Sequence, residues 1–393
     1  MSTVLLAWEL GMGLWHAHQL RLVGRALAER GHKVTYAVAN PVDTWPVLGA
    51  ESAPILQAPL GIPRVRAEDD EFAAESFADV LYEAGFYSAD VLRPLVAAWD
   101  GMLELMRPDL IVADHAPSLL VAALGRIPVV QIGLGFTQPP ADLDPMPSLR
   151  PPYEGSTNEP TALATLREVA QDRGLEAPTS LGSLYKSAAS FVTTFPEFDP
   201  YRPLRKGAPW GALEPLPAPM AAPKSKSYFA YLSADIAASG QVLRELSESG
   251  IPGQAYLRGA HPSLKKALRE AGVDLLDAPA SMEDVLAEHA IIVHHGGVGT
   301  SQQAASAGRP QVLVPWHLEQ GCNAGVLEGC GLGRRLKGAG EAADVVRELL
   351  DDDESAKKAL SFARLVEARG TVPALSQVAE GCELILGDLR RRS

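Results

Sequence analysis

The sequence predicts an α/β protein built from two doubly wound parallel sheets. Short apolar runs alternate with segments of helical periodicity through both halves of the chain, which is typical of β-α-β units. The length of 393 residues favours two domains of ordinary size. Because ligands of open parallel sheets bind beyond the carboxyl ends of the strands, we expect two Rossmann-like domains that face each other across a substrate cleft.

The first β-α-β unit is predicted at the start of the chain. Residues 3–9 form a short apolar run that ends in a glycine-rich turn. Leu20, Val23 and Leu27 then repeat with the period of a helix, which a glycine is predicted to end. Residues 33–39 form the next apolar run. A strand, a helix and a second strand in this order imply parallel pairing.

The same alternation continues to residue 134. We expect a helical stretch near residues 71–106, a strand at 110–113, a helix from about Ser118 and a strand at 129–134. Residues 139–160 contain seven prolines in 22 residues, and proline lacks the amide hydrogen that strands and helix interiors need. This stretch is therefore predicted to be a long surface loop of the kind that often covers a site.

A second proline cluster, seven in the 24 residues 200–223, separates the two halves. Strands are then predicted at residues 228–232, 255–257, 290–294 and 311–315, until the sheet pattern ends near 338. We therefore expect an N-terminal domain of residues 1–200, a linker of residues 201–226, a C-terminal domain of residues 227–375 and a terminal helix of residues 376–393.

Composition and charge exclude several function classes. The chain carries 35 Lys and Arg against 48 Asp and Glu, a formal net charge of −13 that repels nucleic acids and anionic lipids. We therefore expect no nucleic-acid partner. The sequence contains no window near the roughly 18 uncharged apolar residues of a membrane span, so no integral membrane segment is expected either.

The cysteines and the N-terminal segment predict a cytoplasmic protein. Cys322, Cys330 and Cys382 show neither a Cys-x-x-Cys spacing nor the even count of a disulfide framework, which indicates a reducing compartment. The apolar start at residues 4–8 is short and has no basic segment before it, so we do not expect a signal peptide.

The most informative segment begins at His294 and reads His-His-Gly-Gly-Val-Gly-Thr-Ser. It follows a predicted strand and opens a predicted helix. Its glycines let the backbone approach a phosphate closely, and the free amides of the helix N-terminus point at that phosphate with the positive end of the helix dipole. Thr300 and a neighbouring histidine add side-chain donors, so the segment predicts a diphosphate site. The glycine spacing matches neither the dinucleotide fingerprint nor the P-loop.

This segment continues into residues 310–324, Pro-Gln-Val-Leu-Val-Pro-Trp-His-Leu-Glu-Gln-Gly-Cys-Asn-Ala. The whole stretch of residues 294–324 closely resembles the donor-binding motif of family 1, UDP-glycosyltransferase-like, glycosyltransferases. Residues 13–18, Gly-Leu-Trp-His-Ala-His, and residues 30–32, Arg-Gly-His, are similar to the first β-α unit of that family. The resemblance is to the bacterial natural-product and macrolide type, and it implies the GT-B fold.

The resemblance also implies an inverting, metal-independent transferase. Such an enzyme moves a sugar from a UDP- or dTDP-linked donor to a hydroxyl of a small, largely apolar acceptor. The implied partners are thus a nucleotide sugar and a small-molecule acceptor, with no cofactor besides the nucleotide-sugar co-substrate. The sequence contains no His-x-x-x-His pair, and we expect no metal site.

Carried over residue by residue, the resemblance implies which residues bind the donor. Glu319 and Gln320 stand where the family has an Asp-Gln pair that hydrogen-bonds the sugar, and Gln303 stands where the family has a ribose-binding glutamate. His295 and Thr300, with the amides that follow His295, are placed on the diphosphate. The implied donor-binding set is Ser233, His295, Gly297, Val298, Gly299, Thr300, Gln303, Glu319 and Gln320.

The predicted catalytic residues are His16 and Asp114. Inverting transfer needs a base that removes the acceptor proton, and histidine suits that task near neutral pH. The family pattern places this base at His16, after the first strand, while Asp114 at a later strand end matches the acidic partner that orients the ring. A second interpretation makes Asp114 a helix N-cap, because Pro117 and Ser118 follow closely.

Aromatic residues near these positions are candidates for the acceptor pocket. We assign acceptor-binding roles to Trp15, Phe86 and Phe136, and core packing explains the two phenylalanines as readily. His18 lies two residues after the predicted base and is interpreted as structural or acceptor-lining.

Two other functions stay open on the sequence. One is a non-hydrolysing nucleotide-sugar epimerase, which would need additional cleft carboxylates and no acceptor pocket. The other is a catalytically silent sugar-nucleotide-binding protein, because Trp15 and Gln303 depart from the family pattern. The acceptor, the sugar, the nucleotide base and the oligomeric state, monomer or homodimer, are left open.

Overall fold

The chain folds into two compact units, as a computed structural model of all 393 residues shows. The structure describes every residue except 12, 62–73, 151–154, 224, 371–372 and 393. Unit 1 comprises Met1–Glu214 and Pro373–Ser393, and unit 2 comprises Pro215–Val372. The expected linker of residues 201–226 is thus divided between the units. Tyr201 and Leu213, in its first part, are fully buried and belong to unit 1.

Unit 1 is built on a parallel sheet that has six strands among the described residues. They are β1 (Thr3–Trp8), β2 (Lys33–Val38), β3 (Ile55–Gln57), β4 (Leu110–Asp114), β5 (Val129–Gly133) and β6 (Ala189–Val192). Their order is β3-β2-β1-β4-β5-β6, so the winding reverses between β1 and β4. The four predicted strands of this half are confirmed, whereas the short edge strands β3 and β6 were not predicted.

Helices cover the sheet of unit 1. They are α1 (Trp15–Glu29), α2 (Pro41–Leu48), α3 (Phe77–Leu81), the π-helical turn η1 (Tyr82–Phe86), α4 (Ala89–Met106), α5 (Pro117–Ala123), α6 (Glu159–Asp172), the 3-10 turns η2 (Gly182–Tyr185) and η3 (Pro196–Phe198), and α14 (Leu375–Arg392). The helical stretch expected near 71–106 is interrupted at Gly85, whose φ of 109° is not helical. Its residues 71–73 lie outside the described residues.

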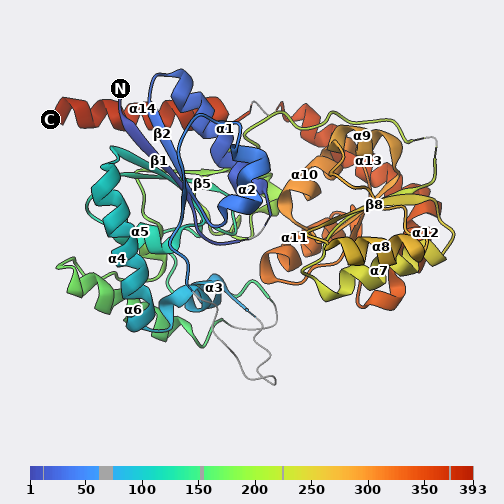
Figure 1. Cartoon of the computed structure of the whole chain (residues 1–393), viewed down its shortest axis with the longest axis horizontal. Helices are drawn as coiled ribbons and strands as arrows, with labels where there is room; N and C mark the ends of the chain where they lie inside the picture. The colour runs from blue at the N-terminus through green and yellow to red at the C-terminus, as the bar shows by residue number, and fades with distance from the viewer. Residues whose placement is uncertain (12, 62–73, 151–154, 224, 371–372, 393) are drawn as a thin grey trace. The chain divides into compact units, whose positions relative to one another are not determined.

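The core of unit 1 joins the two ends of the chain. Figure 1 shows α14, in red, beside α1, in blue. Val4 and Leu6 of β1, Leu20 of α1, and Val378 and Leu386 of α14 are all buried in one apolar cluster. The last helix is therefore part of the fold of unit 1, because its apolar face completes the core on which β1 rests.

Unit 2 repeats the architecture with a parallel sheet of five strands among the described residues. They are β7 (Tyr228–Ser233), β8 (Gly253–Arg258), β9 (Ile291–His294), β10 (Gln311–Leu313) and β11 (Gly333–Arg335), in the order β11-β10-β9-β7-β8. The helices are α7 (Ala237–Glu248), α8 (Pro262–Glu270), α9 (Met282–Glu288), α10 (Val298–Ala307), α11 (Leu318–Gly329), the 3-10 turn η4 (Ala339–Glu341), α12 (Ala342–Asp351) and α13 (Asp353–Ala368). The winding reverses between β7 and β9. The predicted α/β class with two parallel sheets is confirmed.

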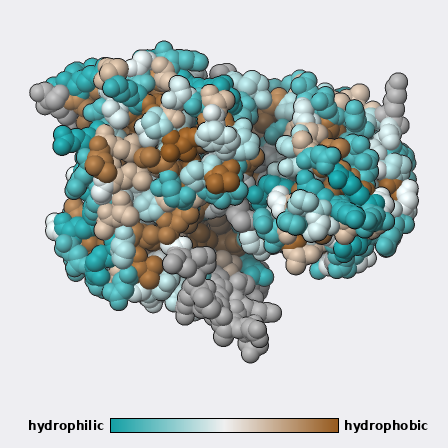
Figure 2. Space-filling model, in the orientation of Figure 1, coloured by the Kyte–Doolittle hydropathy of each residue, from teal (hydrophilic) through white to brown (hydrophobic). Residues whose placement is uncertain are grey.

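The surface mixes hydrophilic and hydrophobic residues, and several brown residues are visible on unit 1 in Figure 2. Val42 and Trp45 of α2 are the most exposed large apolar side chains of that helix, at 81% and 63% exposure. No described helix is long and apolar enough to cross a membrane.

Candidate functional site

His16 and Asp114 meet at the carboxyl edge of the sheet in unit 1. His16 lies in the first turn of α1, and Asp114 ends β4, directly opposite Trp8 of β1. The Nδ1 atom of His16 lies 2.8 Å from Oδ2 of Asp114, and both side chains are buried. The structure therefore brings the two predicted catalytic residues together at the point where the winding of the sheet reverses.

Aromatic and glycine neighbours hold the His16 ring. Trp8 stacks on it with a centroid distance of 5.2 Å and an interplanar angle of 18°, and Trp15 meets it edge-on at 5.5 Å. Gly11 lies on the opposite side of the ring from Asp114. Its φ is 100°, and a Cβ at this position would lie 2.9 Å from Nε2 of His16. The ring thus points Nδ1 at the carboxylate and Nε2 at the glycine turn.

Asp114 does not cap the following helix, so that interpretation is wrong. The N-cap of α5 is Ala116, which has no side-chain hydrogen bond to the helix. The amides of Ser118 and Leu119 donate instead to the carboxylate of Glu9, at 3.0 Å and 2.7 Å. Burial raises the pKa of Glu9 to about 7, although these hydrogen bonds act to lower it. The carboxylate of Asp114 is thereby left to His16.

Further aromatic residues lie near the His16–Asp114 pair. Phe77 of α3 lies 5.9 Å from His115 and 5.4 Å from Phe136, between ring centroids. Phe136 thus belongs to an aromatic group next to the predicted base. Phe86 is fully buried, which fits its alternative interpretation as a core residue.

The glycine-rich segment of unit 2 joins β9 to α10, as predicted. Gly296 has a φ of 87°, and a Cβ there would lie 3.1 Å from the carbonyl oxygen of Gln320. Gly297 is the N-cap of α10 and has no side-chain cap among the described residues. The first amides of this ten-residue helix therefore keep the anion-binding potential of a helix N-terminus. Asn323 of α11 fixes the loop by donating to the Gly296 carbonyl at 2.9 Å.

His294 is a buried neutral residue under this loop. Its Nε2 donates to Oε1 of Gln311 at 2.8 Å, and its Nδ1 accepts from the Gly296 amide at 3.1 Å. Burial lowers the pKa of His294 to about 4, so the ring carries no charge near neutral pH. Its role is to hold the glycine turn.

His295 differs from the expectation. The Ser233 amide donates to its Nε2 at 3.0 Å, and its Nδ1 lies 2.9 Å from the carbonyl oxygen of Val314. A carbonyl only accepts and an amide only donates, so the ring is neutral and carries its proton on Nδ1. Burial, with the charge of Arg258, lowers the pKa of His295 accordingly. The ring links the ends of β7 and β10 and has no remaining proton to donate to a diphosphate.

Comparisons with known proteins find relatives for part of the chain. Residues 271–385 match the family model for the C-terminal domain of erythromycin biosynthesis protein CIII-like proteins. The chain is 35% identical over 78 residues to oleandomycin glycosyltransferase of Streptomyces antibioticus, which is 19% of this chain and 18% of that protein. It is 42% identical over 67 residues to TDP-daunosamine transferase DnrS of Streptomyces peucetius, which is 17% of this chain and 16% of that protein. The chain therefore matches less than a fifth of the length of each of these relatives.

Solved structures match nearly the whole chain. The calicheamicin glycosyltransferase CalG4 has a TM-score of 0.66 at 19% identity, covering 98% of both chains. The kitacinnamycin glycotransferase has a TM-score of 0.65 at 20% identity, covering 98% of this chain and 99% of that one. The spinosyn rhamnosyltransferase SpnG complexed with thymidine diphosphate has a TM-score of 0.63 at 18% identity, covering 94% and 96%. The chain has the GT-B fold. The predicted resemblance to family 1 glycosyltransferases is confirmed.

In this GT-B chain, sequence reasoning missed two charged residues of unit 2. Arg258 ends β8, and its Nη2 donates to Oγ of Ser233 at 3.0 Å and lies 3.2 Å from Oδ2 of Asp235. Ser233 in turn donates to Asp235 at 2.9 Å. Because Ser233 also donates its amide to His295, the guanidinium is adjacent to the predicted diphosphate site. A charged residue at the carboxyl end of a predicted strand was the available signal.

The remaining predicted donor residues of the GT-B chain lie on α10 and α11. Val298, Thr300 and Gln303 lie on α10, within its first six residues. Glu319 accepts from Asn323 at 3.4 Å, and Oε1 of Gln320 accepts from the Trp316 amide at 3.2 Å. The Gln320 side chain therefore folds back on its own loop.

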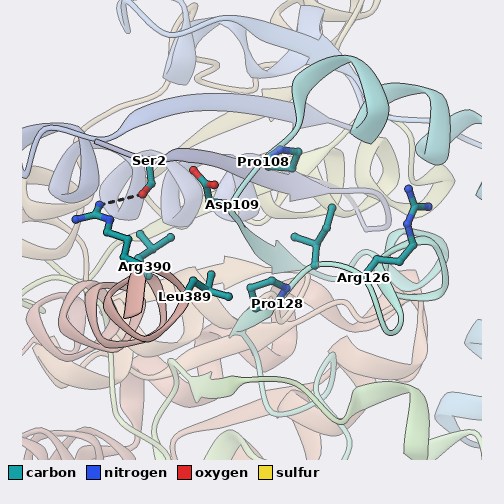
Figure 3. Close-up of a pocket in the computed structure, with 9 residues that line it drawn as sticks. Ser2, Pro108, Asp109, Arg126, Pro128, Leu389 and Arg390 are labelled. Atoms are coloured by element: carbon teal, nitrogen blue, oxygen red, sulfur yellow. Dashed lines mark hydrogen bonds between the residues drawn. The ribbon is translucent and has the colours of Figure 1, made fainter. Parts of the chain in front are cut away.

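A pocket of about 340 Å³ lies at the other end of the unit 1 sheet. Figure 3 shows residues that line it. Ser2 and Asp109 precede β1 and β4, Pro128 precedes β5, and Leu389 and Arg390 come from α14. These residues are at the amino ends of the strands, so the pocket is separate from the His16–Asp114 pair. Among the described residues, no group of three His, Cys, Asp or Glu side chains is arranged to hold a metal ion.

Proposed function

We propose that this GT-B chain is an inverting, metal-independent glycosyltransferase. It moves a sugar from a dTDP- or UDP-linked donor to a hydroxyl of a small, largely apolar acceptor. The observation that carries the proposal is the buried hydrogen bond of 2.8 Å between His16 and Asp114, at the point where the sheet of unit 1 reverses its winding.

The pair supports a general-base role for His16. A neutral ring that donates from Nδ1 to a carboxylate has a lone pair on Nε2, which accepts the acceptor's hydroxyl proton. As the acceptor oxygen bonds to the anomeric carbon, the bond from that carbon to the diphosphate oxygen breaks. Asp114 stabilises the imidazolium that results, as the acidic member of a catalytic triad does. One displacement of this kind inverts the anomeric centre.

Unit 2 supplies groups for the leaving diphosphate. The first amides of α10 and the guanidinium of Arg258 provide positive potential where negative charge develops on the leaving group. Asp235 and Ser233 orient that guanidinium. These charges do the work that a divalent cation does in metal-dependent transferases, which is why we propose a metal-independent reaction.

The nature of the substrates is inferred from the relatives and from unit 1. Among the similar proteins, DnrS is named as a TDP-daunosamine transferase, and SpnG was solved in complex with thymidine diphosphate. We therefore place dTDP-sugars ahead of UDP-sugars as donors. The aromatic group of Phe77 and Phe136 next to His115 favours a largely apolar acceptor. From the cysteine pattern of the sequence we infer that the reaction takes place in the cytoplasm.

The test has two stages. Thermal unfolding is first measured with dTDP, UDP, ADP and GDP in EDTA, since a ligand at ~100 times its Kd adds roughly 2.7 kcal/mol of stability. Turnover of dTDP- and UDP-sugars is then followed with a panel of phenolic and macrolide alcohols. Product with an inverted anomeric centre supports the proposal. Donor isomerisation without acceptor would instead indicate an epimerase, and binding without turnover would indicate a silent binding protein.

A further inference from the structure

The carboxylate of Glu9 connects β1 to α5 through a fully satisfied buried site. Glu9 follows directly on β1, and its side chain is 5% exposed. Oε1 accepts from the Leu119 amide at 2.7 Å and from the Ser118 hydroxyl at 2.8 Å, and Oε2 accepts from the Ser118 amide at 3.0 Å. The indole of Trp99, from α4, also donates to Oε1. Glu9 thus caps a helix that begins more than 100 positions later in the chain.

The backbone between Asp114 and that helix is strained. His115 has a φ of 46°, the left-handed region that side chains other than glycine rarely occupy. The backbone of the Glu9 segment holds this conformation, because the Leu10 amide donates to the His115 carbonyl at 3.0 Å and the Glu9 amide does so at 3.4 Å. The backbone amides of Glu9 and Leu10 therefore hold His115 itself, and the side chain of Glu9 holds the helix that follows it.

This fixed turn adjoins the two residues on which the proposed chemistry depends. Asp114 immediately precedes His115, and Trp8 immediately precedes Glu9 and stacks on the ring of His16. A shift of the β4–α5 turn relative to β1 would therefore change the distance between the Asp114 carboxylate and the His16 ring.

We propose that Glu9 is a positioning residue for the His16–Asp114 pair. By capping α5 from the end of β1, it holds the strained His115 turn in the geometry that keeps Oδ2 of Asp114 on Nδ1 of His16. The side chain of Glu9 accepts from Ser118, Leu119 and Trp99, and we assign it no part in proton transfer. The proposal rests on the proposed function for its effect on turnover, but its effect on the His16 proton can be measured without any substrate.

The main test is the E9Q variant. Above pH 7, where Glu9 is mostly ionised, its carboxylate offers only acceptors to the four donors, whereas the amide of glutamine puts one NH₂ group against them. We expect the Nδ1-bound proton of His16, observed by NMR on ¹⁵N-histidine-labelled full-length protein and assigned with H16Q, to lose its hydrogen-bonded downfield signal. We expect kcat to fall at least tenfold, with the Kd for dTDP unchanged because unit 2 is untouched.

D109N is the matched control. Asp109 accepts the Thr3 amide at 2.8 Å, so it too is a carboxylate that fixes backbone next to β1, but at the opposite edge of the sheet. We expect D109N to retain both the His16 signal and kcat. Loss of the signal in E9Q and D109N alike would show that general destabilisation is responsible and would overturn the proposal.

A double-mutant comparison tests whether Glu9 acts through His16. On the H16Q background, E9Q should lower the residual turnover less than twofold. An equal loss on both backgrounds, or a His16 signal that persists in E9Q, would overturn the proposal.

Near-UV circular dichroism shows whether E9Q folds. If it does not fold, the W99F variant replaces it in the test. It removes one donor to Glu9 and keeps an aromatic ring in place, and we expect a weakened His16 signal with a two- to fivefold lower kcat. An unchanged signal in a folded W99F protein would then overturn the proposal. If the protein binds no nucleotide and turns over no donor, the proposed function fails, while the His16 signal still decides the role of Glu9.

Discussion

Asp114 and Gly133 approach each other so closely that position 133 accommodates only glycine. Gly133 ends β5 with a φ of 130°, and a Cβ built on it would overlap Oδ1 of Asp114. The same carboxylate holds Nδ1 of His16 through its other oxygen at 2.8 Å. The backbone of β5 at Gly133 therefore packs directly against the carboxylate of Asp114, the residue proposed to orient His16.

The G133A substitution is expected to lower activity as well as stability. Its methyl group would push the carboxylate of Asp114 away from His16, and the positive φ adds strain of order 1–3 kcal/mol. We expect kcat to fall about tenfold or more, by the loss of an oriented base. The measurements are kcat and the free energy of unfolding in urea. Gly174 is the control position, since it has a φ of 68° with no atom near its missing Cβ, and G174A should lose stability alone. Equal kcat values for the two variants would contradict this role of Asp114.

Removal of the proposed base is expected to affect chemistry more than folding. H16A should lower kcat by about 10²–10⁴-fold, which is the usual contribution of a general base. The Kd for dTDP should not change, because the residues proposed to bind the nucleotide belong to unit 2. H32Q is the comparison, since His32 forms a similar pair with Glu383 at 2.6 Å after the other end of α1. If H16A stays within a few-fold of the original kcat, His16 is not the base.

Arg258 is expected to be a diphosphate contact. R258A should weaken dTDP binding by about 10- to 100-fold, as expected for loss of a hydrogen bond from a charged group. Thymidine, which has no phosphate, should bind R258A and the original protein equally. Isothermal titration calorimetry checks both ligands. R269A is the control, because Arg269 pairs with Asp277 at 2.6 Å on the exposed side of α8. A similar loss in both arginine variants would point to net charge alone.

The lowered pKa of the buried His294 ring predicts a loss of stability in acid. Burial lowers its folded-state pKa to about 4, below the ordinary 6.5, so the unfolded chain binds more protons between these values. The free energy of unfolding therefore rises with pH through this window, and about 3 kcal/mol of it is lost as the pH falls from 6.5 to 4. Urea unfolding at pH 7 and pH 4.5 should show a smaller difference for H294N. The exposed residue His261 provides the control variant, H261N, which should keep the full pH dependence. An unchanged slope in H294N would show that the pKa of His294 does not differ between the folded and the unfolded chain.

Local pattern was sufficient for much of the architecture and part of the site. The apolar runs that became β1, β4 and β9 were recognisable because each is flanked by turns and buried on both faces. The edge strands β3 and β6 were not recognisable, since short strands carry little pattern of their own. The glycine segment was predictable because its backbone conformations are set by residues next to one another.

The sequence by itself determined the fold class, the anion-binding glycine turn, the helix after the first strand that carries His16, and the strand that ends at Asp114. Only the tertiary structure decided which carboxylate serves which partner. The sequence allowed Asp114 to cap α5, but in the structure the amides of α5 donate to Glu9 instead. The sequence also suggested that His295 donates to a phosphate, but in the structure its Nε2 accepts from the Ser233 amide at the end of β7. Both outcomes depend on hydrogen bonds between segments about 60 to 110 positions apart, and a buried polar group takes the partner that folding brings to it.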